Sequence, residues 1–226
     1  MKILGIFVSL QRYNDAMLKS KSAVNKMMYW IEIIGTIAFA ISGIRLAALK
    51  HFDLFGLYTV GLATAVGGGT IRDLLLGERP FWFYDLIPLL VVLLSLVFFY
   101  FYHELINKIA GTIFLFDTIG LGIFTLIGLT KALDCGCSSV IAIIIGTVTG
   151  AGGGVIRDIC ISETPLIFRK EIYALACVFG GIAYFLLAFF SFSPLVQNIG
   201  CMATVIVIRC LAVKYSWQLP RVKVKG

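Results

Sequence analysis

The stretch AVGGGTIRDLLLGERPFWF, from Ala65 to Phe83, places three consecutive glycines, an arginine and an aspartate inside an otherwise apolar sequence. Nearly the same stretch, GAGGGVIRDICISETPLIF, returns from Gly150 to Phe168. Arg157 follows Arg72 by 85 positions (157 − 72), and the prolines near the ends of the two stretches keep the same offset. One register kept without a gap predicts an internal duplication.

The 85-residue offset extends far upstream of the glycines. It pairs Glu32 with Asp117, Gly35 with Gly120, Phe39 with Phe124, Gly43 with Gly128, Thr64 with Thr149 and Glu78 with Glu163. We interpret the chain as a repeated three-helix unit followed by one extra helix. Because three is odd, the second unit starts on the opposite side of the membrane, so the halves are expected to be inverted repeats about a pseudo-two-fold axis in the membrane plane.

The composition indicates a membrane protein. The chain has 226 residues, of which 60% are hydrophobic and 14% are charged, whereas soluble domains are roughly 45–50% apolar. Seven apolar runs approach or exceed the roughly 20 residues that a helix needs to cross the hydrocarbon core. We predict an all-α polytopic fold with spans at Trp30–Leu49, Leu54–Leu76, Leu86–Tyr102, Thr112–Leu133, Ser138–Ile161, Ile172–Phe192 and Leu195–Val213.

The predicted organisation has five parts. They are an N-terminal extension (1–28), the first three-helix repeat (29–111), the second repeat (112–193), the seventh helix (194–214) and a basic C-terminal tail (215–226). The extension is polar and basic after a short apolar run, and one hypothesis is that translation begins at Met27 or Met28. The distribution of Lys and Arg favours an N-terminus outside and a C-terminus in the cytoplasm.

The glycine triplets lie near the middle of the second and fifth predicted spans. Glycine costs about 1 kcal/mol relative to alanine inside a helix, so we expect both helices to break there. A break would free carbonyls as ligands for a desolvated cation, and two threonine hydroxyls could assist. The alternative is that the glycines only allow close helix packing. The candidate pore and ion-binding residues are Thr64, Gly67, Gly68, Gly69, Thr149, Gly152, Gly153 and Gly154.

The charges that follow the triplets are expensive at membrane depth and should face a partner or water. Adjacent helix residues do not face each other, so each arginine is expected to find its partner elsewhere. We predict the pairs Glu32–Arg72 and Asp117–Arg157. Asp73 and Asp158 are expected nearer the pore or in capping positions. The alternative is that the arginines snorkel to the interface.

The doubled GGGTIRDLLLGERP and GGGVIRDICISETP, with three-plus-three-plus-one helices and short loops, resemble the prokaryotic branch of the trimeric intracellular cation (TRIC) channel family. The resemblance covers Met28–Val213. It implies a homotrimer with one pore per protomer, passage of monovalent cations, chiefly potassium, and the glycine motif on kinked second and fifth helices. The same resemblance extends to sequences labelled as glycine transporters, so a carrier for glycine or another small solute is the alternative function.

Other classes fit the sequence less well. An intramembrane enzyme would need a nucleophile and base or a set of metal ligands at membrane depth, and the sequence has only two histidines, both at span ends. We therefore expect no catalysis, no cofactor and no metal beyond transient potassium or sodium ions. The net charge of +7 is better explained by positive-inside loops and lipid contact than by nucleic acid. The expected location is the inner membrane.

Overall fold

The computed structural model describes residues 2–108, 111–168 and 172–217, and within them the chain forms helices and no strands. The all-α fold class is confirmed. The elements are α1 (Lys2–Leu49), α2 (Leu54–Leu75), the short 3₁₀ helix η1 (Phe81–Phe83), α3 (Ile87–Lys108), α4 (Thr112–Asp134), α5 (Ser139–Cys160), η2 (Leu166–Phe168), α6 (Ala174–Phe189) and α7 (Pro194–Lys214).

Six of these helices contain a segment that is long and apolar enough to cross a membrane. The other helix, α6, is apolar but has only 16 residues, fewer than the predicted span Ile172–Phe192. Large apolar side chains lie on the outer surface of the bundle, among them Phe55, Leu94 and Phe101. Such a surface suits hydrocarbon rather than water, and the chain is a multi-pass membrane protein.

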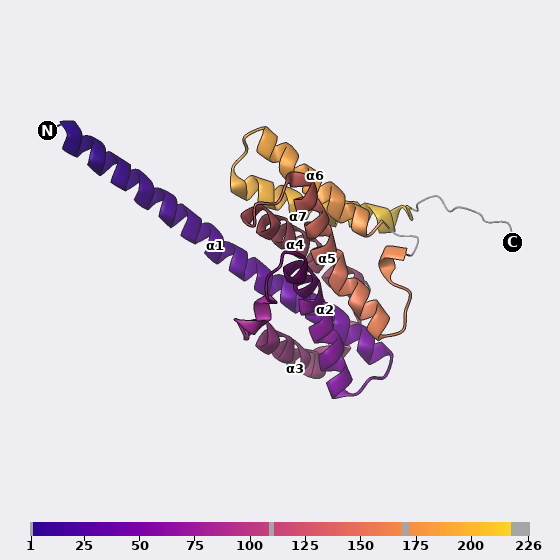
Figure 1. Ribbon diagram of the computed structural model, residues 1–226. Coiled ribbons are helices and arrows are strands. Elements are labelled where there is room, and N and C mark those ends of the chain that lie inside the picture. The colour runs from indigo at the N-terminus through magenta and orange to yellow at the C-terminus, as the bar shows by residue number, and fades with distance from the viewer. Residues whose placement is uncertain (1, 109–110, 169–171, 218–226) are drawn as a thin grey trace.

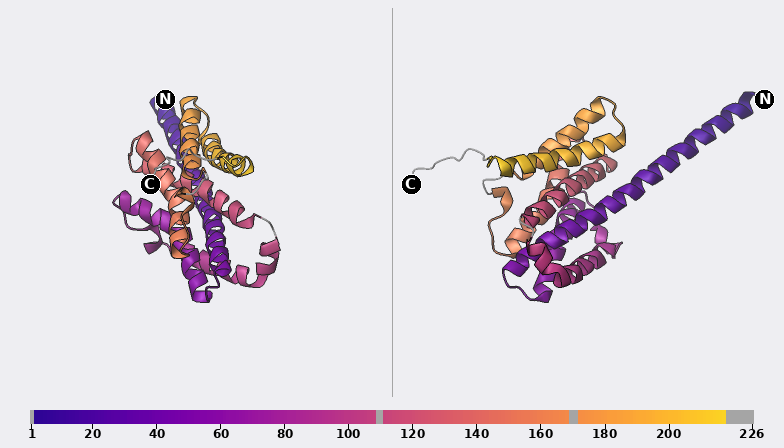
Figure 2. Two further views of the ribbon diagram at one scale, coloured as in Figure 1. Left: turned by 90° about the vertical axis from the view of Figure 1, so that its right-hand side faces the viewer. Right: turned by 180° about the vertical axis from the view of Figure 1, so that it is seen from behind.

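Helix α1 runs without interruption from Lys2 to Leu49 and projects far beyond the bundle at its N-terminal end (Figure 1). The predicted boundary at residue 28 therefore lies inside one helix, and the segment of membrane length is Lys26–Leu49. The C-terminal end of α7 lies on the opposite side of the bundle from the N-terminal end of α1 (Figure 2). Of the predicted tail, residues 218–226 lie outside the described residues.

The bundle is built around the contact between α2 and α5. Helix α1 packs against α2 and α4, α4 packs against α5, and α6 packs against α7; α3 and the α6–α7 pair lie on opposite flanks of the bundle (Figure 1). Near its centre, the rings of Phe39 and Phe124 stack with their centroids 5.1 Å apart. These two residues are related by the 85-residue offset, so equivalent positions of the two units meet here.

The predicted breaks at the glycine triplets are absent, because α2 and α5 each continue as α-helix through all three glycines. The intrinsic penalty of about 1 kcal/mol per glycine is offset by tertiary packing. A Cβ on Gly68 would overlap the backbone carbonyl oxygen of Thr149, and a Cβ on Gly153 would overlap that of Thr64. The glycines let two helix backbones approach closely, as the alternative interpretation of the triplets expects.

Candidate functional site

Two threonines lie one turn before the glycines, at the contact between α2 and α5. The hydroxyls of Thr64 and Thr149 each donate to the carbonyl four residues earlier, those of Val60 and Ile145, at 2.6 Å. Both threonines are buried. In this conformation the hydroxyls are therefore hydrogen-bonded within their own helices. Gly68 and Gly153 are covered by the facing helix, whereas Phe81 lies over Gly69 and Tyr173 lies over Gly154.

The arginines bind the aspartates that follow them, which corrects the expectation that neighbours on a helix cannot pair. Arg72 Nε donates to Asp73 Oδ1 at 2.7 Å, and Arg157 Nε donates to Asp158 Oδ1 at 2.9 Å. The rule that adjacent helix residues do not face each other concerns the directions of their Cβ atoms. The long arginine side chain can nevertheless fold back to the carboxylate of the next residue. Neither arginine snorkels, since Arg72 is 2% exposed and Arg157 is 1% exposed.

The second oxygen of each aspartate fixes the loop after its helix. Asp73 Oδ2 accepts a hydrogen bond from the Phe81 amide at 2.8 Å, and Asp158 Oδ2 accepts one from the Leu166 amide at 2.9 Å. In both cases the donor lies eight residues later, at the start of a 3₁₀ helix. The Arg-Asp pair of each repeat thus anchors its own loop in the same way.

Besides the aspartate that follows it in the sequence, Arg157 binds further polar side chains, which Arg72 does not do within the described part of the chain. Its Nη1 contacts Asp117 Oδ1 at 2.5 Å, so the predicted Asp117–Arg157 pair is present, and the same nitrogen donates to Ser42 Oγ at 2.9 Å. The Tyr173 hydroxyl also donates to Asp117 Oδ1, at 3.3 Å. This buried cluster joins α1, α4, α5 and the residue that precedes α6.

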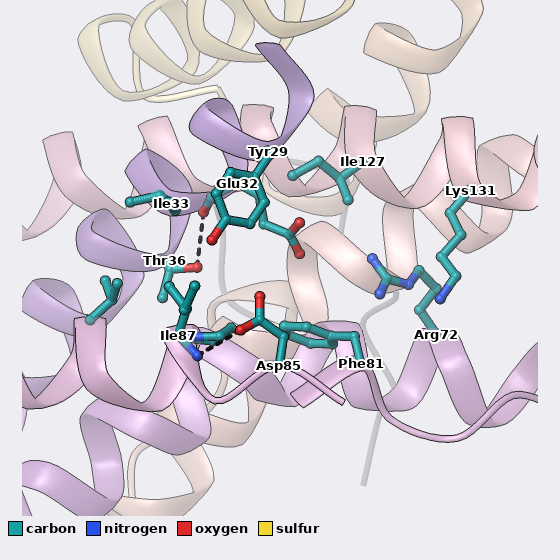
Figure 3. A pocket seen from close by; sticks show the side chains of 12 residues that line it. Tyr29, Glu32, Ile33, Thr36, Arg72, Phe81, Asp85, Ile87, Ile127 and Lys131 are labelled. Atoms are coloured by element: carbon teal, nitrogen blue, oxygen red, sulfur yellow. Dashed lines mark hydrogen bonds between the residues drawn. The ribbon is translucent and has the colours of Figure 1, made fainter. Parts of the chain in front are cut away.

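The predicted Glu32–Arg72 ion pair does not form at contact distance, and Arg72 instead binds Asp73. Both side chains instead line one cavity of about 230 Å³, which we call the Arg72 cavity. Glu32 and Asp85 point into it, and Arg72 lies at its other end beside Lys131 (Figure 3). An adjoining cavity of about 790 Å³ shares Glu32 and Lys131 with it.

Lys131 of α4 has no equivalent in the other half. Its Nζ lies 2.8 Å from Asp73 Oδ1 and 2.7 Å from Glu78 Oε2, whereas the offset places Leu46 at the matching position. The hydrogen bond from Lys131 holds the pKa of the Glu78 carboxyl below its usual value. This contact is therefore complete near neutral pH and is lost as the pH falls through that lowered pKa.

On the other side of the α2–α5 crossing lies a cavity of about 350 Å³, which we call the Arg157 cavity. Arg157 and Asp158 line it together with Lys50 and Glu163, whose Nζ and Oε1 atoms are 2.6 Å apart. The two cavities thus end at equivalent arginines. The crossing that contains the glycine triplets separates them.

Several site residues escaped the sequence analysis. Ser42, Lys131, Tyr173 and Arg209 all contact the predicted charges. Of these, Lys131 and Arg209 carry a usable signal, because each is a charge within a predicted apolar span. The others become meaningful only when the helices are placed side by side.

Known membrane proteins resemble this chain in sequence and in fold. The family profile described as "Glycine transporter" matches residues 29–104 and 114–188, which is one match to each three-helix unit. The UPF0126 inner membrane protein YadS of Escherichia coli (strain K12) is 38% identical over 198 residues, covering 86% of this chain and 95% of that protein.

Two solved structures have the same fold. A structure described as "Structural basis for conductance through TRIC cation channels" has a TM-score of 0.78 and 34% identity, covering 87% of this chain and 97% of that one. The TRIC trimeric intracellular cation channel orthologue from Rhodobacter sphaeroides has a TM-score of 0.79 and 31% identity, covering 84% and 98%.

Proposed function

The chain belongs to the prokaryotic TRIC channel family, whose profile is described as glycine transporter, and from that premise we propose that it is a cation channel. The observation that carries the proposal is the match to TRIC channel structures over 84–87% of the chain at 31–34% identity. The relatives and structural neighbours are membrane proteins and channels rather than enzymes.

We further propose a homotrimer with one potassium-permeable pore per protomer, as the trimeric neighbours suggest. The Arg72 and Arg157 cavities are the two ends of the route, and the α2–α5 crossing is its closed centre. Conduction requires these helices to separate. We propose that the pathway then runs past the small residues of this crossing, which are Thr64, Gly67, Gly68, Gly69, Thr149, Gly152, Gly153 and Gly154.

The proposal is tested with purified protein in planar bilayers under potassium chloride and then sodium chloride gradients. We expect discrete current steps whose reversal potential follows the cation gradient, with potassium permeant. Protein-free bilayers are the control. A silent bilayer together with saturable glycine uptake into vesicles would contradict the channel and support a carrier. The carrier is the less favoured function because the solved neighbours are channels.

The proposed orientation, with the N-terminus outside and the C-terminus in the cytoplasm of an inner membrane, predicts the reactivity of two cysteines. Cys135 precedes α5 and Cys160 ends it, and both are exposed. When single-cysteine variants of the protein are produced in cells and the cells are converted to spheroplasts, a membrane-impermeant maleimide should label Cys135 quickly. Cys160 should be labelled only after the cells are opened. The reverse pattern would show the opposite orientation.

A further inference from the structure

Arg209 is a buried charge on α7, the helix that lies outside the repeat. Its side chain is 1% exposed. The guanidinium carbon lies 5.3 Å from the ring centroid of Phe114 and 4.9 Å from that of Tyr173. Nη1 donates to the carbonyl of Ile172 at 3.5 Å. Two aromatic faces and a backbone oxygen thus hold this cation in one place.

The same guanidinium faces the carboxylate of Asp117. Arg209 Nη2 is 3.9 Å from Asp117 Oδ2, while Arg157 occupies Oδ1 of the same carboxylate. Asp117 is itself 1% exposed, so water screens these charges weakly and their interaction is strong. One buried carboxylate is therefore placed between two arginines from different helices.

The two halves reach electrical neutrality by different routes. Among the residues of described burial, the buried charges on the Arg72 side are Arg72 and Asp73, which balance each other. On the Arg157 side they are Asp117, Asp158, Arg157 and Arg209, which also balance. The position equivalent to Lys131 is Leu46 on that side, so the additional positive charge comes from α7.

We propose that Arg209 sets the electrostatic barrier to cations on the Arg157 side of the pathway by cancelling the charge of Asp117. The proposal rests on the cation-channel function. Without Arg209, the buried cluster would carry one net negative charge and attract a cation. Without the charge of Asp117, it would carry one net positive charge and repel a cation. The seventh helix thereby makes the two ends of the route electrically different.

The test compares potassium conductance at low salt in four variants. We expect Arg209→Met to raise single-channel conductance and Asp117→Asn to lower it, each by about tenfold. One unbalanced unit charge in the weakly screened interior acts strongly on a passing cation. The double variant restores neutrality and should conduct within about twofold of the unmodified protein. Lys214→Met is the matched control, since it removes an exposed charge from the last turn of the same helix. The potassium-to-chloride permeability ratio should move with conductance.

Opposite signs distinguish this role from a purely structural one. If Arg209 only supported packing, Arg209→Met and Asp117→Asn would shift conductance in the same direction, and that result would overturn the proposal. Should Arg209→Met fail to assemble, a double variant that conducts as poorly as Asp117→Asn would overturn it as well. An unmodified protein that gives no current would contradict the channel function itself, and with it this inference.

Discussion

Replacing Gly153 by alanine is expected to destabilise the folded protein severely. The new Cβ would overlap the carbonyl oxygen of Thr64, and a backbone atom cannot rotate away as a side chain can. Helices α2 and α5 would have to separate, and overpacking of this kind costs about 3 kcal/mol. The gain in helix propensity, about 1 kcal/mol, offsets only part of that loss. Gly68→Ala should behave alike because its Cβ would overlap the Thr149 carbonyl.

The measurement is the temperature at which the peak of the folded, detergent-solubilised protein disappears from size-exclusion chromatography. Gly152→Ala is the matched control within the same triplet, because the nearest atom to its added Cβ is Gly68 Cα at 3.3 Å. We expect a smaller fall in its midpoint than for Gly153→Ala, because a contact at 3.3 Å requires a shift of only a few tenths of an ångström. Equal losses for Gly152→Ala and Gly153→Ala would show that the overlap with the Thr64 carbonyl does not set the cost of the substitution.

Arg157→Met is expected to destabilise the protein more than Arg72→Met, although the two arginines are equivalent in the repeat. Removing one partner from a buried ion pair costs roughly 3–5 kcal/mol. Loss of Arg157 takes contacts away from Asp117, Asp158 and Ser42. Loss of Arg72 leaves Asp73 still bound by Lys131.

The same chromatographic assay checks this difference, with Arg157→Lys as an intermediate variant. Lysine keeps the charge but cannot reproduce the planar fork that reaches several acceptors. The midpoint temperature is expected to be highest for the unmodified protein, lower for Arg72→Met and lowest for Arg157→Met. If Arg72→Met lowered the midpoint as much as Arg157→Met, Lys131 would not be compensating the charge of Asp73 when Arg72 is removed.

The sequence alone was sufficient for the fold class, because apolar runs of membrane length are set by composition and bilayer thickness. It also indicated the correspondence between halves, since the offset that pairs Asp73 with Asp158 also relates their loop hydrogen bonds. The Asp117–Arg157 contact is predicted from the side of the membrane on which the two residues are expected to lie, although the same argument wrongly predicts the Glu32–Arg72 pair.

The remaining features depend on tertiary contacts that a local pattern does not contain. Helix propensity alone predicts breaks at the glycine triplets, whereas the structure keeps both helices intact because the facing helix packs against the glycines, with its carbonyls within reach of an added Cβ. The spacing of residues along a helix does not show that the Arg72 side chain folds back onto Asp73, so the pairing of Arg72 is visible only in the structure. Lys131 and Arg209 acquire their roles only through helices that are distant in sequence.

The aspartate that anchors each loop also bears on the order in which the chain assembles during synthesis. Asp73 and Asp158 each close a contact over eight residues, so either loop can form as soon as its own helix leaves the ribosome and enters the membrane. The Asp117–Arg157 contact spans 40 residues, and the Ser42–Arg157 contact spans 115. Since longer separations close later, we expect the first three helices to wait, locally ordered, until α5 arrives to complete the centre.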